Sequence, residues 1–196
     1  MHSSELTPEM IYWGYREGWF PMVLNEETDE TQWLKPRDRC LFPIEGIRLS
    51  RSLQKTIRQG KFEIRFDTNF TQVIENCRRP EANWINDDFI RVYSQIYMEG
   101  WGHCAECWFS GKLVGGVYGI AIGGVFFAES MFHLMTDASK VALWALVETC
   151  RDKGFVLFDA QIMNPHLLSL GAYEIPNEEY DRLLGEAIVL GTEWSA

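Results

Sequence analysis

Apolar residues recur at helical spacing in four segments of the chain. Residues 7–18 begin with Thr, Pro and Glu and stop at a glycine, which predicts a short capped helix. Residues 50–60 place two apolar side chains four positions apart among basic ones, which predicts an exposed amphipathic helix. Residues 87–99 and 138–153 carry longer apolar stripes, each ended by glycine. We expect a helix in each segment, with Asp137 as the N-cap of the last.

Alternation of apolar and polar residues predicts strands between these helices. Residues 62–66 alternate strictly, as a half-buried strand does. Three longer apolar runs follow, separated by a Ser-Gly-Lys turn and a Gly-Gly turn, and they predict an antiparallel meander. The three runs span residues 104–109, 113–122 and 125–131.

An apolar run over residues 155–162 predicts a buried strand near the end of the chain. Asp159 and Gln161 lie two positions apart in it, so their side chains should point to one face of the sheet. A short helix is expected at 165–170, and the acidic segment that starts at residue 25 is expected to form a loop ending near Pro36. This order of helices and strands is typical of acyltransferases of the N-acetyltransferase superfamily, although such an analogy does not specify the acyl group.

The composition favours one main domain without a metal site. With 196 residues, 46% of them hydrophobic, the chain can bury a sizeable core. No apolar run approaches the roughly 18 residues of a membrane helix, and the first residues lack a signal-peptide layout, so we expect a cytosolic protein that does not contact membranes. Five scattered cysteines indicate reduced thiols. Cys104 and Cys107 have metal-like spacing beside His103, but no second cysteine pair completes a four-ligand site.

The net charge of -10 argues against broad nucleic-acid binding, because phosphate contacts require Lys and Arg. Five basic residues nevertheless cluster between positions 48 and 61. They form either a local basic patch or an ordinary solvated helix face, and both interpretations stay open.

Eight short motifs carry a more specific signal. In order they are Glu17-Gly18-Trp19-Phe20-Pro21, Trp33 with Pro36-Arg37, Asn83-Trp84-Ile85, Gly115-Gly116-Val117-Tyr118-Gly119, Phe127-Ala128-Glu129-Ser130-Met131-Phe132, Ala138-Ser139-Lys140, Phe158-Asp159-Ala160-Gln161 and Ser169-Leu170-Gly171-Ala172. Together they resemble the leucyl/phenylalanyl-tRNA-protein transferases over nearly the whole chain. The resemblance implies an α+β, N-acetyltransferase-like (GNAT-like) fold with a mixed, mainly antiparallel sheet flanked by helices. It also implies a small, shortened N-terminal subdomain in residues 1–48 and a catalytic domain in residues 49–196.

The same resemblance implies an aminoacyltransferase. Such an enzyme moves Leu or Phe, and possibly Met, from the 3′ end of aminoacyl-tRNA to the N-terminal Arg or Lys of an acceptor protein, which marks the acceptor for N-degron degradation. Because the aminoacyl ester is already activated, neither ATP nor a metal nor another cofactor is expected. A CoA-dependent N-acetyltransferase and a catalytically silent binding protein are the alternatives. Residues 133–137 argue against the former, since they offer a pyrophosphate no glycine turn and place an acid at the helix start.

Asp159 and Gln161 are the expected catalytic residues. The resemblance implies that Asp159 lies close to the attacking α-amine and Gln161 close to the donor carbonyl. A structural hydrogen-bonded pair is the alternative. An aspartate with a pKa near 3.9 is a poor general base unless burial raises that value. We therefore expect orientation and electrostatic stabilisation rather than full proton abstraction.

Glu129 is the expected recognition residue for the donor amino acid. The resemblance implies that its carboxylate binds the donor's α-ammonium or orients the pocket, with Ser130 beside it. A buried glutamate paired with Lys140 or an arginine is the alternative. Four further residues match positions that would line an apolar pocket for the Leu or Phe side chain, although core packing is their default role. They are Val117, Phe126, Met131 and Leu143.

Trp84 and Tyr93 match family positions that contact the terminal adenosine of the donor. A base stacked on an aromatic ring contributes about 1–3 kcal/mol. Core packing is the alternative for both residues. Met22 departs from the family pattern, which has a tryptophan after Phe-Pro, so the resemblance does not supply the second side of the adenine stack.

Overall fold

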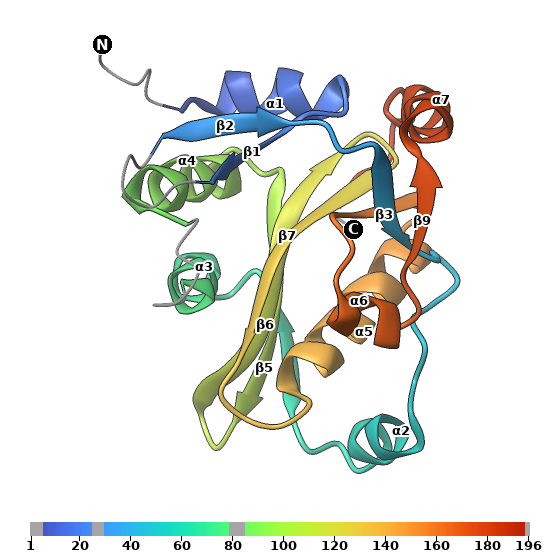
Figure 1. Cartoon of the computed structure of the whole chain (residues 1–196). Coiled ribbons are helices and arrows are strands. Elements are labelled where there is room, and N and C mark those ends of the chain that lie inside the picture. Colours follow the sequence, from blue (N-terminus) through green and yellow to red (C-terminus); the bar gives the residue numbers. More distant parts are fainter. Residues whose placement is uncertain (1–5, 25–29, 79–84, 195–196) are drawn as a thin grey trace.

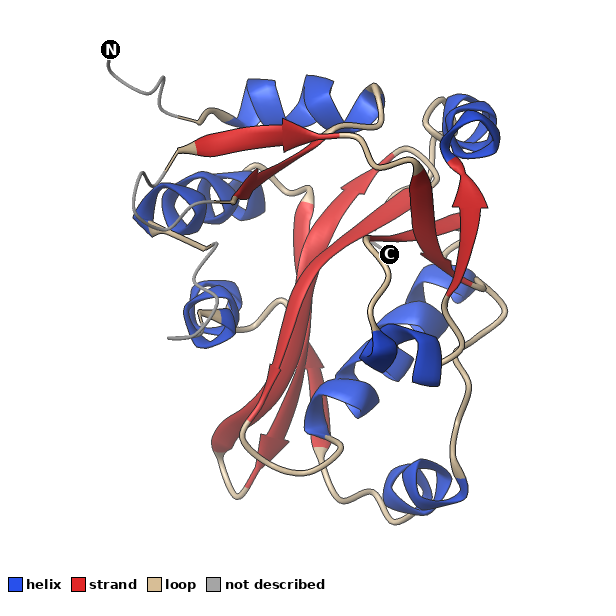
Figure 2. Cartoon of the chain, viewed as in Figure 1, coloured by secondary structure: helices blue, strands red, loops and turns tan. Residues whose placement is uncertain are grey.

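Seven strands form one continuous sheet, and helices cover both of its faces (Figures 1 and 2). The computed structural model describes residues 6–24, 30–78 and 85–194. From edge to edge the sheet contains β4 (Glu63–Phe66), β5 (Gly102–Phe109), β6 (Lys112–Ile122), β7 (Val125–His133), β8 (Leu157–Gln161), β3 (Asp38–Phe42) and β9 (Tyr173–Pro176). Neighbouring strands are antiparallel except for β7 and β8, which are parallel. The predicted α+β class and the mainly antiparallel sheet are thus confirmed.

Two hydrophobic clusters hold the helices against the sheet. The first cluster packs against α1 (Pro8–Arg16), α3 (Phe70–Cys77), α4 (Asp87–Met98) and α7 (Asn177–Ala187). The second packs against α2 (Arg51–Arg58), α5 (Ala138–Asp152) and α6 (Pro165–Ser169). Neighbouring strand residues alternate between the clusters, since Tyr118 and Phe127 belong to the first and Val117 and Phe126 to the second.

All four helices predicted from apolar spacing are present. The side chains of Thr7, Ser50 and Asn86 cap α1, α2 and α4 by accepting a hydrogen bond from the backbone N–H three positions on. Asp137 occupies the predicted N-cap position of α5, but the prediction that its side chain caps the helix is wrong. Asp137 stands at the start of α5 with φ of 69° and makes no side-chain cap. Its carboxylate instead accepts a hydrogen bond from Lys140 Nζ.

The predicted meander is confirmed as β5, β6 and β7, and the strand predicted near Asp159 is confirmed as the shorter β8. The expected loop before Pro36 is wrong in its second half. Its residues 25–29 lie outside the described ranges, but β2 (Thr31–Leu34) follows and pairs with β1 (Phe20–Val23) in a separate antiparallel ribbon. Sequence spacing also missed β3, β9, α3 and α7.

The sheet divides between β7 and β8. These strands pair only over Val125–Phe127 and Leu157–Asp159. Beyond that point β8 continues beside β3, while β7 continues beside β6 alone. A bulge in β7 leaves Glu129 without a paired residue on β6 just past the division. The bulge requires Gly119 on β6, because a Cβ atom there would lie 2.1 Å from the Phe127 carbonyl oxygen.

Strand β3 lies inside the segment 1–48, and it pairs with both β8 and β9 of the main sheet. The segment before it forms α1 and the β1–β2 ribbon at one end of the molecule (Figure 1). A division of the chain at residue 48 stays a prediction.

The described ranges contain no helix with the length and apolar character needed to cross a membrane. They likewise contain no group of three or more His, Cys, Asp or Glu side chains close enough to hold a metal ion. All five cysteines lie in the described ranges, are buried and form no disulfide.

Candidate active site

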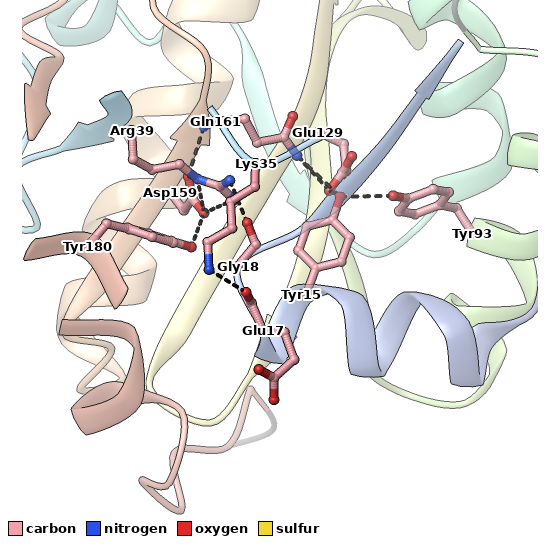
Figure 3. A network of polar contacts seen from close by, with 10 residues as sticks. All are labelled: Tyr15, Glu17, Gly18, Lys35, Arg39, Tyr93, Glu129, Asp159, Gln161 and Tyr180. Carbon is pink, nitrogen blue, oxygen red and sulfur yellow. Dashed lines mark hydrogen bonds and ion pairs between the residues drawn. The ribbon is translucent and has the colours of Figure 1, made fainter. Parts of the chain in front are cut away.

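A buried polar network fills the place where β7 and β8 part. It joins side chains from both strands, from α1, α4 and α7, and from β3 (Figure 3). Asp159 and Gln161 come from β8 and Glu129 from β7. These three side chains face the first hydrophobic cluster, so Asp159 and Gln161 do share a face of the sheet. Burial of so many polar groups is costly unless each finds a partner.

The Asp159 carboxylate is completely buried and fully hydrogen-bonded. Oδ1 accepts from Arg39 Nε at 2.9 Å and from the Gln161 backbone N–H at 2.8 Å. Oδ2 accepts from Arg39 Nη2 at 2.6 Å and from the Tyr180 hydroxyl at 2.6 Å. An ionised carboxylate has about four lone-pair positions. All four have donors, so Asp159 has none free for an incoming amine.

Arg39 is the buried cation of this network. Its side chain is fully buried, and its guanidinium lies 4.8 Å from the Phe20 ring centroid and 4.6 Å from that of Tyr180. Nη1 donates to the carbonyl oxygen of Gly18 at 3.1 Å. Burial opposes the charged form, but the Asp159 carboxylate outweighs it and raises the pKa of Arg39 above its usual value. The Arg39 guanidinium therefore keeps its charge at every working pH.

Gln161 connects Asp159 to a second group of polar side chains. It is a non-glycine residue with φ of 62°, a left-handed conformation that costs free energy and persists only where its surroundings enforce it. The Asp159 carboxylate supplies that constraint through the Gln161 backbone N–H. The Gln161 side-chain amide then donates to the Tyr15 hydroxyl at 3.2 Å and to Glu129 Oε1 at 3.1 Å.

The Glu129 carboxylate accepts hydrogen bonds from Tyr15 and Gln161 where β7 and β8 part. The Tyr15 hydroxyl donates to Oε1 at 2.5 Å, and the Tyr93 hydroxyl lies 3.1 Å from that of Tyr15. Burial raises the pKa of Glu129 to about 7, although the hydrogen bonds from Tyr15 and Gln161 act in the opposite direction. The alternative pairing with Lys140 is wrong, because Lys140 Nζ contacts Asp137. Glu129 is thus a carboxyl group that gains and loses its proton near neutral pH.

Replacing Glu129 with glutamine should flatten the pH dependence of stability. The folded-state pKa of about 7 exceeds the ordinary value of 4.5, so the native state binds this proton more tightly than the unfolded state. The resulting stabilisation is complete below about pH 4.5 and is lost as the pH rises through 7. Its loss should amount to roughly 1–3 kcal/mol. Urea unfolding at pH 5.5 and pH 8 measures this change in the free energy of unfolding. The free energy should fall with pH more steeply in the parent protein than in Glu129→Gln. Equal slopes would contradict a buried, titrating Glu129.

The remaining predicted site residues divide between the two faces of the sheet. Tyr93 lies in the polar network, and Ser130 is half-buried on β7 next to Glu129. The four predicted pocket residues belong to the second cluster, on the opposite face from Glu129. They are Val117, Phe126, Met131 and Leu143, of which only Met131 is partly exposed. Their role in binding a donor side chain stays a prediction. Trp84 lies outside the described residues, and Met22 is half-buried on β1.

Sequence reasoning missed three residues of the network: Arg39, Tyr15 and Tyr180. A signal existed for Arg39, since it precedes the apolar run Cys-Leu-Phe and a buried arginine requires an acidic partner. Tyr15 lies on the buried face of α1 four positions after Ile11, a pattern typical of ordinary core packing. No local pattern marks Tyr180, because its partner Asp159 lies 21 residues earlier.

Comparisons with known proteins agree over most of the chain. Residues 41–185 match the family described as Leucyl/phenylalanyl-tRNA protein transferase. A protein of that name from Herpetosiphon aurantiacus is 44% identical over 95% of this chain and 96% of its own length. One from Gloeobacter violaceus is 42% identical over 94% of this chain and 95% of its own. Among solved structures, a GCN5-related N-acetyltransferase-like protein from Streptococcus suis is 16% identical, covers 85% of this chain and 65% of its own, and has a TM-score of 0.39.

Proposed function

The chain belongs to the leucyl/phenylalanyl-tRNA protein transferase family, and we propose that it transfers Leu or Phe from aminoacyl-tRNA to acceptor proteins that begin with Arg or Lys. It is an aminoacyltransferase, as its motifs predicted. The match over residues 41–185 carries the assignment, and it includes Glu129, Asp159 and Gln161. The Arg or Lys preference is the finer part of the proposal. It is supported by the net charge of -10, which suits a cationic acceptor.

The reaction requires positioning more than strong acid–base chemistry. The acceptor's α-amine attacks the ester carbonyl carbon of the donor, the bond to the terminal adenosine oxygen breaks, the amine loses a proton and the released 3′ oxygen gains one. An α-amine has a pKa of about 7.7–8.0, so a useful fraction is neutral at pH 7.5. The occupied lone pairs of Asp159 support orientation and electrostatics as its role, rather than proton abstraction.

We place the donor's reacting end at the gap between β7 and β8. The Gln161 amide is a neutral donor there whose two N–H groups bond Tyr15 and Glu129, so one of them must turn to the ester carbonyl oxygen when the donor binds. Glu129 is an acceptor that becomes negative near pH 7, which suits the α-ammonium of the donor amino acid. Tyr93 lies completely buried at the edge of the same network, so its contact with the terminal adenosine requires the residues that cover it to move.

An aminoacyl-transfer assay tests the proposed function directly. The protein is incubated with Leu-, Phe-, Met- or Ile-charged tRNA and a peptide that begins with Arg or Lys, and the extended peptide is measured by mass. Leu and Phe should be transferred, and Ile at least about tenfold more slowly, because a misplaced methyl group costs about 1–3 kcal/mol in an apolar pocket. Absence of Leu and Phe transfer would exclude this activity. Binding of acetyl-CoA by calorimetry would favour the acetyltransferase alternative instead.

A further inference from the structure

An aromatic pocket lies on the exposed side of α1. It has a volume of about 550 Å³ and six lining residues: Met10, Trp13, Gly14, Glu17, Trp19 and Trp33. Trp13 and Trp19 are exposed by 55% and 42%, which is unusual for such large apolar side chains. The cavity volume is typical of ligand sites. Nothing in the proposed mechanism uses these side chains.

The pocket is a built part of the fold. Three of its residues, at positions 10, 13 and 14, lie on one face of α1, and Glu17 follows at the C-cap of the helix. Trp33 enters from β2 and packs directly on Gly14, where a Cβ atom would lie 2.1 Å from the ring. The glycine therefore lets the β1–β2 ribbon approach the helix and hold Trp33 in place. Trp33 belongs to one of the eight sequence motifs, and the proposed reaction gives it no role.

The pocket combines indole faces with a carboxylate, a chemistry that suits a cation. Glu17 is exposed, and its side chain points away from the buried network (Figure 3). An indole face attracts guanidinium or ammonium groups by about 0.5–2 kcal/mol. Trp13 already shows this behaviour, since the Arg16 guanidinium lies 5.7 Å from its ring centroid. Lys35 Nζ donates to the backbone carbonyl oxygen of Glu17 at 3.0 Å and pairs with the Asp181 carboxylate at 2.9 Å, so its bonds do not go to the Glu17 carboxylate.

The pocket lies beside the candidate active site. The carbonyl oxygen of Gly18 accepts from Arg39 at 3.1 Å, and Arg39 in turn donates to Asp159 at 2.6 Å. One guanidinium group thus spans the gap between Asp159 and the backbone next to Glu17. Figure 3 shows Glu17 at the edge of this network. Gly18 is flanked by Glu17 and Trp19, which both line the pocket, so the pocket borders the residue that Arg39 holds.

We propose that the aromatic pocket binds the cationic side chain at the N-terminus of the acceptor polypeptide. Glu17 supplies the charge and the tryptophans supply the walls. The inference rests on the proposed transfer to acceptors that begin with Arg or Lys, and it names the site that selects them. Neutral side chains of similar length gain neither the ion pair nor the cation–π contact.

Acceptor kinetics of the full-length protein test this site. At saturating Phe-tRNA, the Glu17→Gln variant should show an acceptor KM raised about five- to tenfold for a peptide that begins with Arg, with kcat changed less than about twofold. A peptide that begins with citrulline, the neutral isostere of arginine, should bind both proteins equally weakly. Trp13→Ala should raise the same KM, and Glu9→Gln, an exposed carboxylate on the same helix, should not.

Two other results would overturn the assignment. In the first, the parent protein is active, but Glu17→Gln leaves the acceptor KM for both the Arg peptide and the citrulline peptide at the parent's value. The pocket is then not the acceptor site, while the transferase function stands. If the KM for Phe-tRNA rises and that for the peptide does not, the pocket binds the donor tRNA. Failure of the parent protein to transfer any amino acid would instead remove the proposed function itself.

Discussion

Asp159→Asn should lower kcat for aminoacyl transfer about 100- to 1,000-fold, with a much smaller change in KM for the donor. The carboxylate holds the Gln161 backbone N–H and balances the charge of Arg39. An asparagine offers one oxygen where four donors converge, so the left-handed conformation of Gln161 loses its constraint. The effect is expected on the reaction step because Gln161 is the residue we place at the donor carbonyl.

Steady-state kinetics with Phe-tRNA and an Arg-initiated peptide measure this prediction. The assay temperature must lie well below the Tm of the variant, checked by circular dichroism, so that unfolding does not imitate a loss of activity. Asp152→Asn is the matched control, because Asp152 also pairs with an arginine but lies exposed at the end of α5. An Asp159→Asn variant that remains folded and keeps kcat within a few-fold of the parent would show that Asp159 has no part in the reaction.

Arg39→Gln should reduce the free energy of unfolding by about 3–5 kcal/mol. Removal of one member of a buried ion pair leaves the other charge buried without compensation. Asp159 is fully buried, so water cannot replace the guanidinium without a rearrangement of Phe20 and Tyr180. Chemical unfolding in urea measures the change. Arg182→Gln, at an exposed pair with Glu186, should cost no more than about 1 kcal/mol.

A double-mutant cycle measures how much Arg39 and Asp159 stabilise each other, apart from their contacts with other residues. Arg39→Gln combined with Asp159→Asn removes both charges, so the double variant should be destabilised by clearly less than the sum of the two single changes. Strict additivity would mean that the two side chains do not stabilise each other, contrary to their 2.6 Å contact.

Local signals explain which elements could be predicted from the sequence. The caps at Thr7, Ser50 and Asn86 and the turns of the meander act within a few residues, so the sequence specifies them directly. The short strands β1, β2, β3 and β9 have four or five residues each and, unlike the equally short β4, do not lie in a strictly alternating segment. Their pairing partners, not their own composition, determine that they are strands.

The site was predictable only in part for a similar reason. Family resemblance indicated Asp159, Gln161, Glu129 and Tyr93, and the fold brings these four side chains into one network. Resemblance did not indicate which face of the sheet each side chain occupies. The bulge in β7 reverses the alternation after Glu129, so that Met131 joins the opposite face. Arg39 was missed because its partner lies 120 residues away along the chain.

That separation has a consequence for synthesis on the ribosome. Arg39 is made 120 residues before Asp159, and at about 5–20 residues per second the delay is roughly 6 to 24 s. During this time β3 has neither of its neighbours, since β8 and β9 both lie in the last quarter of the chain. The nascent chain must therefore keep a charged arginine and an unpaired strand in solvent until β8 has been made, and the part of the sheet that contains β8, β3 and β9 forms after the part that contains β4 to β7.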